Sequence, residues 1–417
     1  MTMFILNLGN HDINTNYIMK NYNAVLFIFL FLIVENINPC TTAVISAKAS
    51  SDGRSMIWKL RDAGELENYF KYFDDGKYSY IGLINSSDTI GINVWGGSNS
   101  AGFAIMNSAS YNVNIGDTTS IKDMGGVFMK IALQTCSSLQ DLEILLDKYP
   151  KPRGLATHFG VIDAYGGAAF YEVNNQSWTK FDANSDPNGY IIRTNFSETG
   201  TLDEGYGFIR RQTAEKIFAD AKQNNLLNYQ TVIQKFTRCF YHPVFELDYR
   251  KIYESSIPET DFVFSTDFIT RYSSASSIIV QGTKNGESPD MNTVWGQVGF
   301  PETCVAMPMW VHNGKNIPQL LQYNSIIKNS QLNLYALEWK KDVYPVGHSE
   351  GSNYLKMKLL INSCGTGYVQ RIEQLEKLVF FLIEEKLILW RKNNPDVSEI
   401  NVFYEELNKM VTDFYVK

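Results

Sequence analysis

The sequence has few of the residues that build metal and nucleotide sites. Its 417 residues include five histidines and five cysteines, and neither a C-x-x-C nor an H-E-x-x-H pattern is present. The usual ligand spacings of zinc sites are therefore missing. The glycine-rich turn at 96–102 is not followed by G-K-[ST] or G-x-G-x-x-G, so it does not indicate a phosphate loop. We expect neither a metal nor a cofactor.

Long basic, apolar or repetitive segments are also missing. The net charge is −7 and no run of lysine and arginine occurs, which argues against a nucleic-acid partner. A membrane-spanning helix needs roughly 20 apolar residues, whereas the longest apolar run here has eleven. We find no low-complexity tract and no internal repeat. With 44% hydrophobic residues, the composition is that of a globular protein with one large domain or two ordinary ones.

The eleven-residue apolar run at 24–34 lies close to the start of the chain and follows Lys20. A secretory signal peptide has an apolar core of about 7–15 residues after a positive segment. We therefore predict a leader at 1–39 that is removed, and export to the periplasm or the extracellular space. Because Pro39 fits poorly before a signal-peptidase cut, we expect trimming in two steps or self-cleavage. The alternative is an uncleaved anchor or a buried helix.

Cys40 is the first residue after the predicted leader. If it becomes the chain terminus, its thiol stands beside its own α-amine, whose ordinary pKa of about 7.7–8.0 suits proton transfer near neutral pH. One residue then supplies both nucleophile and base. The alternative is a cysteine that carries a lipid or forms a disulfide, in which case the protein is an exported binding protein or lipoprotein.

Two short strands are predicted directly after Cys40, at 41–49 and 55–59, joined by a turn with glycine. Antiparallel pairing brings the segment from Lys59 to Asp62 beside Cys40. There, a carboxylate would orient the α-amine and a cation would lower the pKa of the thiol. The alternative is a cluster of charges on the surface at a strand end.

Two further polar residues lie in predicted strands. Asn107 ends the strand predicted at 103–107, and a side-chain amide in that position can donate to a developing oxyanion. The alternative is an asparagine in an ordinary turn. His158 has no acid or cysteine beside it in the sequence, and we interpret it as a packed or hydrogen-bonded residue rather than a catalytic base.

Strands and helices are predicted in alternating blocks. Strands are expected at 80–84, 90–95, 103–107, 157–163, 168–173, 190–195 and 278–282, and helices at 123–134, 138–147, 207–221, 226–240 and 368–391. Strands, then helices, strands again and terminal helices are typical of a layered α+β protein. The amphipathic stretch at 368–391 is expected to pack on the domain.

These features together resemble the N-terminal-nucleophile (Ntn) hydrolases that cleave linear amides. That group contains choloylglycine hydrolases, penicillin V acylases and acyl-CoA:isopenicillin N acyltransferases. Cys-Thr-Thr at 40–42 and the strand end at 58–62 are similar to the nucleophile strand and its basic-x-x-Asp partner. The strand at 103–107 is similar to the one that carries the oxyanion asparagine, and Ile-Arg-Thr-Asn at 192–195 resembles the segment with a second active-site asparagine. The resemblance covers residues 40 to about 313.

The resemblance implies a four-layer αββα fold, with two antiparallel sheets packed between helices. It implies a hydrolase domain at 40–330, and we expect 331–417 to form a mostly helical extension packed on it. The catalytic residues it implies are Cys40, Lys59, Asp62, Asn107 and Asn195.

The sequence departs from bile-salt-type members at two positions. Those members have an arginine where Lys59 stands here, and another in the serine-rich segment where this sequence has Ser277. Lysine keeps the charge without the two-pronged geometry of a guanidinium. Arg61 and Arg271 are the candidates to take the place of the missing arginines.

The predicted activity is hydrolysis of a linear amide, either non-peptide or N-acyl, through a cysteine thioester. The expected partner is a small-molecule N-acyl amide, with no nucleic acid and no stable membrane span after processing, and self-association is compatible with the sequence. The alternative is an acyltransferase that moves the acyl group to an amine acceptor, because it would use the same residues.

Overall fold

The computed structural model describes residues 40–416. The predicted leader at 1–39, its apolar segment and its removal lie outside the described residues. Within the described chain, two large antiparallel sheets are the main framework, one of seven strands and one of six.

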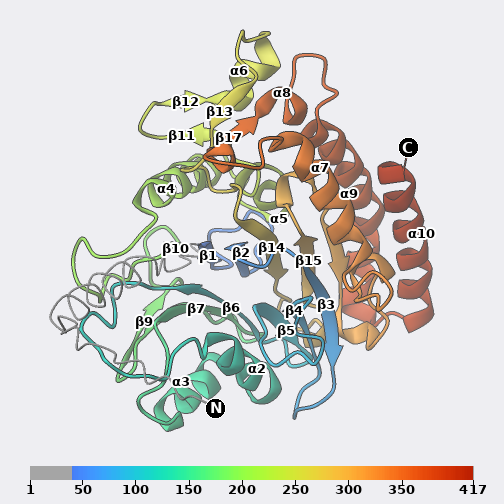
Figure 1. The fold of residues 1–417 in the computed structure, drawn as a ribbon. Coiled ribbons are helices and arrows are strands. Elements are labelled where there is room, and N and C mark those ends of the chain that lie inside the picture. Colours follow the sequence, from blue (N-terminus) through green and yellow to red (C-terminus); the bar gives the residue numbers. More distant parts are fainter. Residues whose placement is uncertain (1–39, 417) are drawn as a thin grey trace, which may run out of the picture. The chain divides into compact units, whose positions relative to one another are not determined.

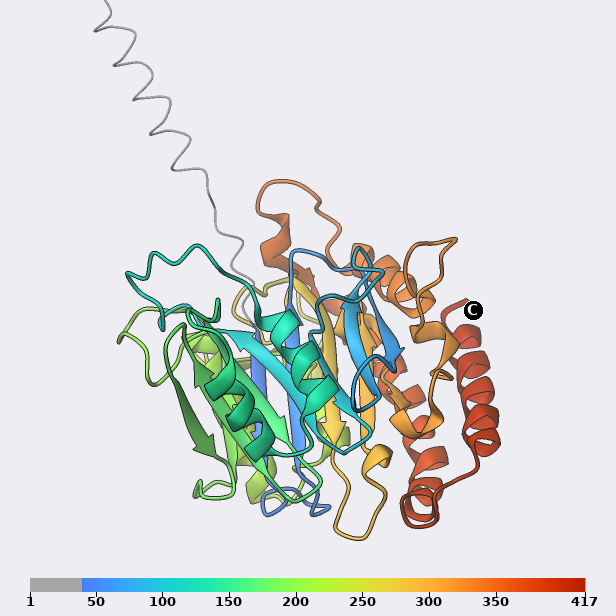
Figure 2. The same ribbon diagram turned by 90° about the horizontal axis from the view of Figure 1, so that it is seen from below.

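The seven-stranded sheet has strands in sequence order, β3-β4-β5-β6-β7-β8-β9. Its strands are β3 (Asn68–Phe73), β4 (Tyr80–Asn85), β5 (Gly96–Asn99), β6 (Ala104–Ala109), β7 (Thr157–Ile162), β8 (Ala168–Val173) and β9 (Trp178–Asp182). Helices α2 (Gly125–Thr135) and α3 (Leu139–Lys148) cover its outer face (Figures 1 and 2). Apolar residues such as Phe128, Leu142 and Phe159 form the core between this sheet and the two helices.

The six-stranded sheet has the order β10-β1-β2-β14-β15-β16. Its strands are β1 (Thr41–Ile45), β2 (Met56–Asp62), β10 (Tyr190–Arg193), β14 (Ser274–Gln281), β15 (Thr293–Val298) and β16 (Met307–Met309). All residues of β1, β2 and β14 are buried, because this sheet is covered on both faces. Polar side chains inside these strands must therefore find partners in the interior.

Helices cover the other face of the six-stranded sheet (Figure 1). They are α4 (Phe208–Gln223), α5 (Tyr229–Thr231) with the π-helical turn Val232–Phe236, α7 (Gln331–Val343), α9 (Tyr368–Asn393) and α10 (Val397–Val416). Tyr229 stacks on Trp295 of β15, and Phe380 of α9 packs edge-on against the same indole. The order helix, sheet, sheet, helix confirms the predicted α+β fold with an αββα arrangement and C-terminal helices.

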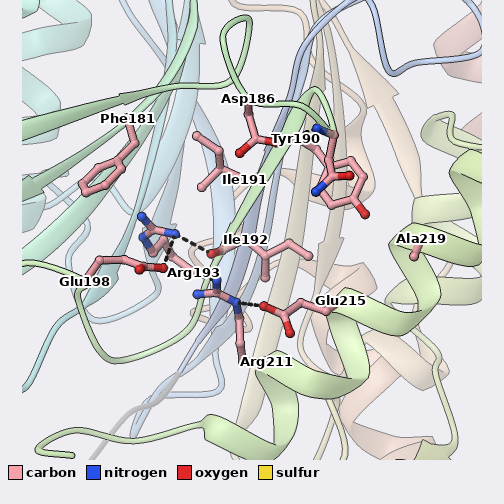
Figure 3. Close-up of a pocket in the computed structure, with 11 residues that line it drawn as sticks. Phe181, Asp186, Tyr190, Ile191, Ile192, Arg193, Glu198, Arg211, Glu215 and Ala219 are labelled. Carbon is pink, nitrogen blue, oxygen red and sulfur yellow. Dashed lines mark hydrogen bonds and ion pairs between the residues drawn. The ribbon is translucent and has the colours of Figure 1, made fainter. Parts of the chain in front are cut away.

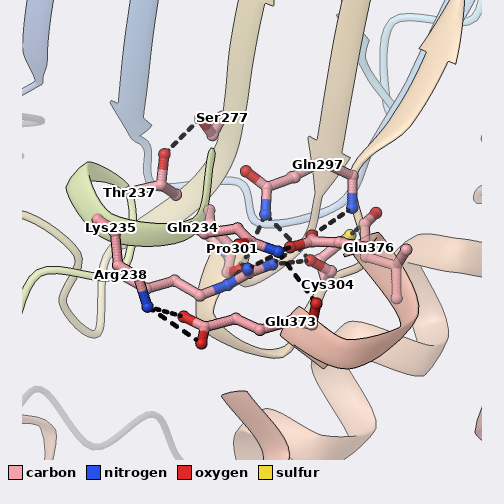
Figure 4. Close-up of polar contacts among 12 residues, drawn as sticks. Gln234, Lys235, Thr237, Arg238, Ser277, Gln297, Pro301, Cys304, Glu373 and Glu376 are labelled. Atoms are coloured by element: carbon pink, nitrogen blue, oxygen red, sulfur yellow. Dashed lines mark hydrogen bonds and ion pairs between the residues drawn. The ribbon is translucent and has the colours of Figure 1, made fainter. Parts of the chain in front are cut away.

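A buried ion pair links α9 to Arg238, which follows the π-helical turn Val232–Phe236 (Figure 4). Both guanidinium nitrogens of Arg238 donate to the carboxylate of Glu376 at 2.7 Å, and both side chains are fully buried. Arg238 also donates to the carbonyl of Cys304, and the backbone N–H of Ala306 donates to Glu376. Helix α9 thus shares a polar centre with the loop between β15 and β16. The boundary at residue 330 stays a prediction.

Several smaller elements pack beside the helices that cover the six-stranded sheet. Two short ribbons pair β11 (Tyr241–His242) with β12 (Leu247–Asp248) and β13 (Phe262–Phe264) with β17 (Tyr354–Lys356). Helices α6 (Tyr249–Ser255) and α8 (Met357–Leu360) accompany them. Their apolar side chains form a separate core cluster that includes Phe240, Phe268 and Leu360.

Two sequence-based element predictions are wrong. No strand forms at 90–95, because the Asp88 carboxylate accepts backbone hydrogen bonds from Gly91, Ile92 and Asn93 and closes a loop there. The helix predicted at 226–240 spans only 229–236, where the α-helical turn passes into a π-helical one. Across residues 40–416, no helix is long and apolar enough to cross a membrane.

Candidate active site

The β1–β2 hairpin places Cys40 at the end of the layer between the two sheets. Thr42 pairs with Lys59 and Thr41 with Leu60 in the register of the hairpin, and the same register, continued by one more residue, sets Cys40 across from Arg61. Partners directly across an antiparallel pair point to the same face. The Thr42 hydroxyl lies 3.3 Å from the Ser108 hydroxyl of β6, so this face looks toward the seven-stranded sheet.

Cys40 is buried and in close contact with the end of β2. The residue is 5% exposed, and its sulfur lies 4.0 Å from the carbonyl oxygen of Asp62. The carbonyl oxygen of Cys40 accepts a hydrogen bond of 2.6 Å from Arg210 of α4. The sequence-based expectation that 59–62 lies beside Cys40 is confirmed, and the alternative of a surface charge cluster is wrong, because Lys59, Arg61 and Asp62 are all buried.

Lys59 and Asn107, predicted from separate segments, are in direct contact. The Nζ atom of Lys59 donates to Oδ1 of Asn107 at 2.7 Å and to the carbonyl of Trp95 at 2.8 Å. Burial lowers the pKa of Lys59 from its ordinary 10.5 to about 7, and the neighbouring Arg61 lowers it further while Cys40 opposes the shift. Its oxygen is taken by Lys59, so the Asn107 amide has its NH₂ group left to donate. One hydrogen of that group is directed at the Thr157 hydroxyl, 3.4 Å away, which leaves the other.

Asp62 projects to the opposite face of β2 from Lys59 and Arg61. Its Oδ2 atom lies 2.5 Å from Nη2 of Arg271, and its Oδ1 atom accepts from the Ser274 hydroxyl. Of the two candidates to replace the family arginines, Arg271 is thus the one paired with Asp62. Ser277 lies on the same helix-facing side, where its hydroxyl contacts Thr237 (Figure 4). The same hydroxyl also contacts the Trp58 indole.

Asn195 is fully buried and reaches Cys40 through Arg210. Its Nδ2 atom donates to the carbonyl of Ala109, and its Oδ1 atom accepts from Nη2 of Arg210 at 2.9 Å. Arg210 also donates to the hydroxyl of Thr41, so one guanidinium joins the start of β1 to the segment after β10. The predicted direct role of Asn195 at the reacting atoms stays a prediction.

Arg210 is a residue that the sequence reasoning missed. It lies in the first turn of α4 and is 2% exposed. Burial lowers its pKa to about 9, and Arg271 adds to this effect, whereas Asp62 and Cys40 oppose it. The one available signal was an arginine within the helix predicted at 207–221. Nothing in the sequence distinguishes it from the adjacent Arg211, which is partly exposed and pairs with Glu215.

His158 is a hydrogen-bonded structural residue, in agreement with the sequence-based interpretation. Its two ring nitrogens lie 2.9 Å from the Ser108 hydroxyl and 2.8 Å from the Ser197 hydroxyl. Burial lowers its pKa well below the ordinary value, and Arg193 and Arg211 add to this effect. A neutral imidazole between two hydroxyls ties β7 to β6 and to the segment after β10.

Of the other cysteines, Cys136, Cys239 and Cys304 are buried and Cys364 is exposed, and none of the four is in a disulfide within 40–416. Burial raises the pKa of Cys239 and of Cys304 to about 12. Thiols of this kind stay protonated and are poor nucleophiles. In the same part of the chain, no group of three or more His, Cys, Asp or Glu side chains is placed to hold a metal ion.

A surface pocket of about 490 Å³ lies away from these residues, at the edge strand β10. Ile192 and Arg193 line it together with Arg211 and Glu215 of α4 (Figure 3). The Arg193 guanidinium donates to the carbonyl of Ile192 and so covers the strand edge. None of the five predicted catalytic residues lines this pocket, and we assign it no role in the chemistry.

Comparison with known proteins gives one family match. Residues 62–251, somewhat less than half of the chain, match the family model described as acyl-coenzyme A:6-aminopenicillanic acid acyl-transferase. The match agrees with the resemblance found in the sequence, to the Ntn hydrolases that act on linear amides. It supports an enzyme of the amidase and acyltransferase type. A search of curated proteins found no match.

Several solved structures align with the chain at low similarity. The N-acylethanolamine-hydrolyzing acid amidase ortholog of Caenorhabditis elegans is 15% identical, with a TM-score of 0.34 over 46% of this chain and 86% of its own. A variant of the conjugated bile acid hydrolase of Clostridium perfringens is 11% identical, with a TM-score of 0.36 over 65% and 92%. Penicillin V acylase from Agrobacterium tumefaciens is 12% identical, with a TM-score of 0.31 over 65% and 85%. These superpositions are too weak to support a conclusion about substrate.

Proposed function

We propose that the mature protein is an amidohydrolase that uses Cys40 as an N-terminal nucleophile. Removal of 1–39 would free the α-amine of Cys40, and export of the protein belongs to the same proposal. The observation that supports it best is the position of Cys40. It is buried at the end of the inter-sheet layer, on the face that carries Lys59, and Lys59 holds the Asn107 amide.

The reaction begins when the α-amine of Cys40 takes the thiol proton and the sulfur attacks the amide carbonyl. The S–C bond forms, the C–N bond breaks, and the proton passes to the departing amine. A water molecule then attacks the thioester carbon through its oxygen, and the α-amine takes a proton from that water. The C–S bond breaks, the acid is released, and the proton returns to the sulfur.

The surrounding residues have positioning and electrostatic roles in this proposal. Asp62, held by Arg271 and Ser274, orients the α-amine through its charge. Asn107 donates its NH₂ group to the oxyanion, and Lys59 fixes the orientation of that amide. Arg210 holds the carbonyl of Cys40 and is itself held by Asn195, so Asn195 acts through Arg210.

Transfer of the acyl group to an amine acceptor is the second candidate. The description of the matching family model, an acyl-transferase acting with acyl-coenzyme A, favours it. Every step up to the thioester is the same, and an amine then takes the place of water. Product analysis with and without added amine separates the two activities.

Mass spectrometry of the protein from its host tests the proposal. We expect an intact mass that begins at an unmodified Cys40, and a covalent adduct equal to the acyl group after brief exposure to N-acyl amides and acid quenching. Cys40→Ser should lose the adduct and most turnover, whereas Cys364→Ser, which alters an exposed thiol, should keep both. A lipidated Cys40, or a mature terminus elsewhere, would refute the proposal and favour a binding protein.

A further inference from the structure

Three buried polar groups beside the candidate site have no hydrogen-bond partner among residues 40–416. They are Nη1 of Arg61, Nε1 of Trp95 and the hydroxyl of Ser276. Arg61 is 4% exposed and Ser276 is fully buried. Buried polar groups in folded proteins are nearly always paired, so three together need an explanation.

The three groups belong to one place in the fold. The Arg61 guanidinium lies over the Trp95 ring, 4.7 Å from the ring centroid. Ser276 of β14 is the direct cross-strand partner of Arg61 in β2. The two side chains therefore share the face that looks toward the seven-stranded sheet, and this is also the face of Cys40.

The positive charge at this place has no counter-ion within the described chain. Neither Arg61 nor Lys59 takes part in an ion pair there, and both acceptors of Lys59 are neutral oxygens. The carboxylate of Asp62 points to the other face, where it pairs with Arg271. The charge of Glu65 favours the protonated form of Arg61 and so raises the pKa of that guanidinium. The Glu65 carboxylate itself, however, accepts hydrogen bonds from the backbone N–H and the hydroxyl of Ser87.

A carboxylate is the chemical group that matches this arrangement. A guanidinium binds a carboxylate through charge-assisted hydrogen bonds, and the indole N–H and the serine hydroxyl can each donate one more. Burying an unpaired guanidinium destabilises the folded protein. An apolar substrate would leave that destabilisation in place, whereas an anionic substrate removes it.

We propose that Arg61, Trp95 and Ser276 form a subsite for a substrate carboxylate next to Cys40. The enzyme then selects amides that carry a carboxylate close to the scissile bond, on the amine part or on the acyl part. This inference names the substrate class of the activity proposed above and rests on that activity.

Two matched pairs of compounds test the subsite on the mature, full-length enzyme. N-octanoylglycine and N-octanoylglycinamide differ by a carboxylate on the amine part, and N-glutarylbenzylamine and N-pentanoylbenzylamine differ by one on the acyl part. We expect the acid of one pair to have the higher kcat/KM, mainly through a lower KM, and the pair that responds identifies the part that carries the carboxylate.

The variants separate a binding role from a structural one. Arg61→Leu should raise KM for the preferred acid about 10- to 100-fold, the range expected when a charged hydrogen-bond partner is lost, and should abolish the preference. Arg61→Lys should keep part of the preference for the acid, because the positive charge remains. The rest should be lost with the two-pronged hydrogen-bonding geometry of the guanidinium. Arg54→Leu removes a guanidinium at the far end of the same hairpin, where Arg54 pairs with Glu287, and should leave the preference intact.

Equal kcat/KM values within both pairs would overturn the proposal and indicate that water alone satisfies the three groups. An equal loss for acid and neutral compound in Arg61→Leu would also overturn it. If neither pair is turned over in a Cys40-dependent way, the proposed activity toward these amides fails. Calorimetric binding of the same pairs to Cys40→Ala then decides the subsite: preferential binding of an acid supports it, and equal or absent binding refutes it.

Discussion

The Nζ atom of Lys59 lies 2.7 Å from Oδ1 of Asn107. This contact joins β2 of one sheet to β6 of the other, and it leaves the NH₂ group of Asn107 as the amide's donor. The contact links two residues that were each chosen from the sequence for separate reasons.

Asn107→Ala should lower kcat by about 10²- to 10³-fold, the usual effect of removing one oxyanion donor. Lys59→Met should lower it less, because the amide remains and only its orientation is lost. Single-turnover rates of thioester formation measure both effects, with circular dichroism to verify the fold. If Asn107→Ala forms the thioester at the wild-type rate, the oxyanion role is wrong.

The Asp62–Arg271 pair should be important for stability as well as for activity. The Asp62 side chain is 1% exposed, so Arg271→Ala would leave a buried carboxylate without its cation. We expect a loss of about 3–5 kcal/mol in the free energy of unfolding, measured by urea denaturation. Asp62→Asn should raise the activation free energy, calculated from kcat, by more than it lowers the free energy of unfolding. The reason is that the paired charge is lost while the shape of the side chain is kept. The opposite ranking would indicate a purely structural residue.

Two buried lysines should make the stability depend on pH. Burial lowers the pKa of Lys59 and of Lys340 from 10.5 to about 7. Between about pH 7 and pH 10, the unfolded chain therefore binds protons that the folded chain does not. The free energy of unfolding should rise with pH in this range, by up to about 1.4 kcal/mol per pH unit for each lysine. Lys59→Met and Lys340→Met should each flatten the slope in urea titrations, and an unchanged slope in both would contradict the expectation.

The Arg238–Glu376 pair should hold α9 to the rest of the domain (Figure 4). Glu376→Gln removes the charge but not the volume, so a buried guanidinium loses its counter-ion, and we expect a loss of about 3–5 kcal/mol. Glu384→Gln alters a more exposed position of the same helix, where the carboxylate accepts from Gln230, and should cost less than 1 kcal/mol. Urea denaturation of the two variants compares them, and similar losses would contradict a special role for the buried pair.

The hairpin shows what could be predicted from sequence at the candidate site. The turn at 50–54 and the alternation on either side were sufficient to place Lys59 to Asp62 beside Cys40, because antiparallel pairing is a local consequence of those patterns. Asn107 was a candidate because of its place at the end of a predicted strand, and Asn195 came from the family resemblance. That Asn107 contacts Lys59 could not be predicted locally, since it depends on pairings distant in sequence.

Local patterns were less reliable where side chains compete with the backbone. Residues 90–95 alternate like a strand, yet the Asp88 carboxylate captures three backbone N–H groups and forms a loop. That loop places Trp95 against Arg61, which a continuous strand would not predict.

The sequence by itself determined the α+β class, the hairpin with Cys40 at its start, and the resemblance to the linear-amide enzymes, because composition, alternation and short motifs are properties of neighbouring residues. Only the tertiary structure decided which arginine serves which partner. Arg210 holds the carbonyl of Cys40, Arg271 pairs with Asp62, and Arg61 stays without a counter-ion in the described chain. Charged side chains look alike in a sequence, and their roles follow from the face of the strand or helix on which burial places them.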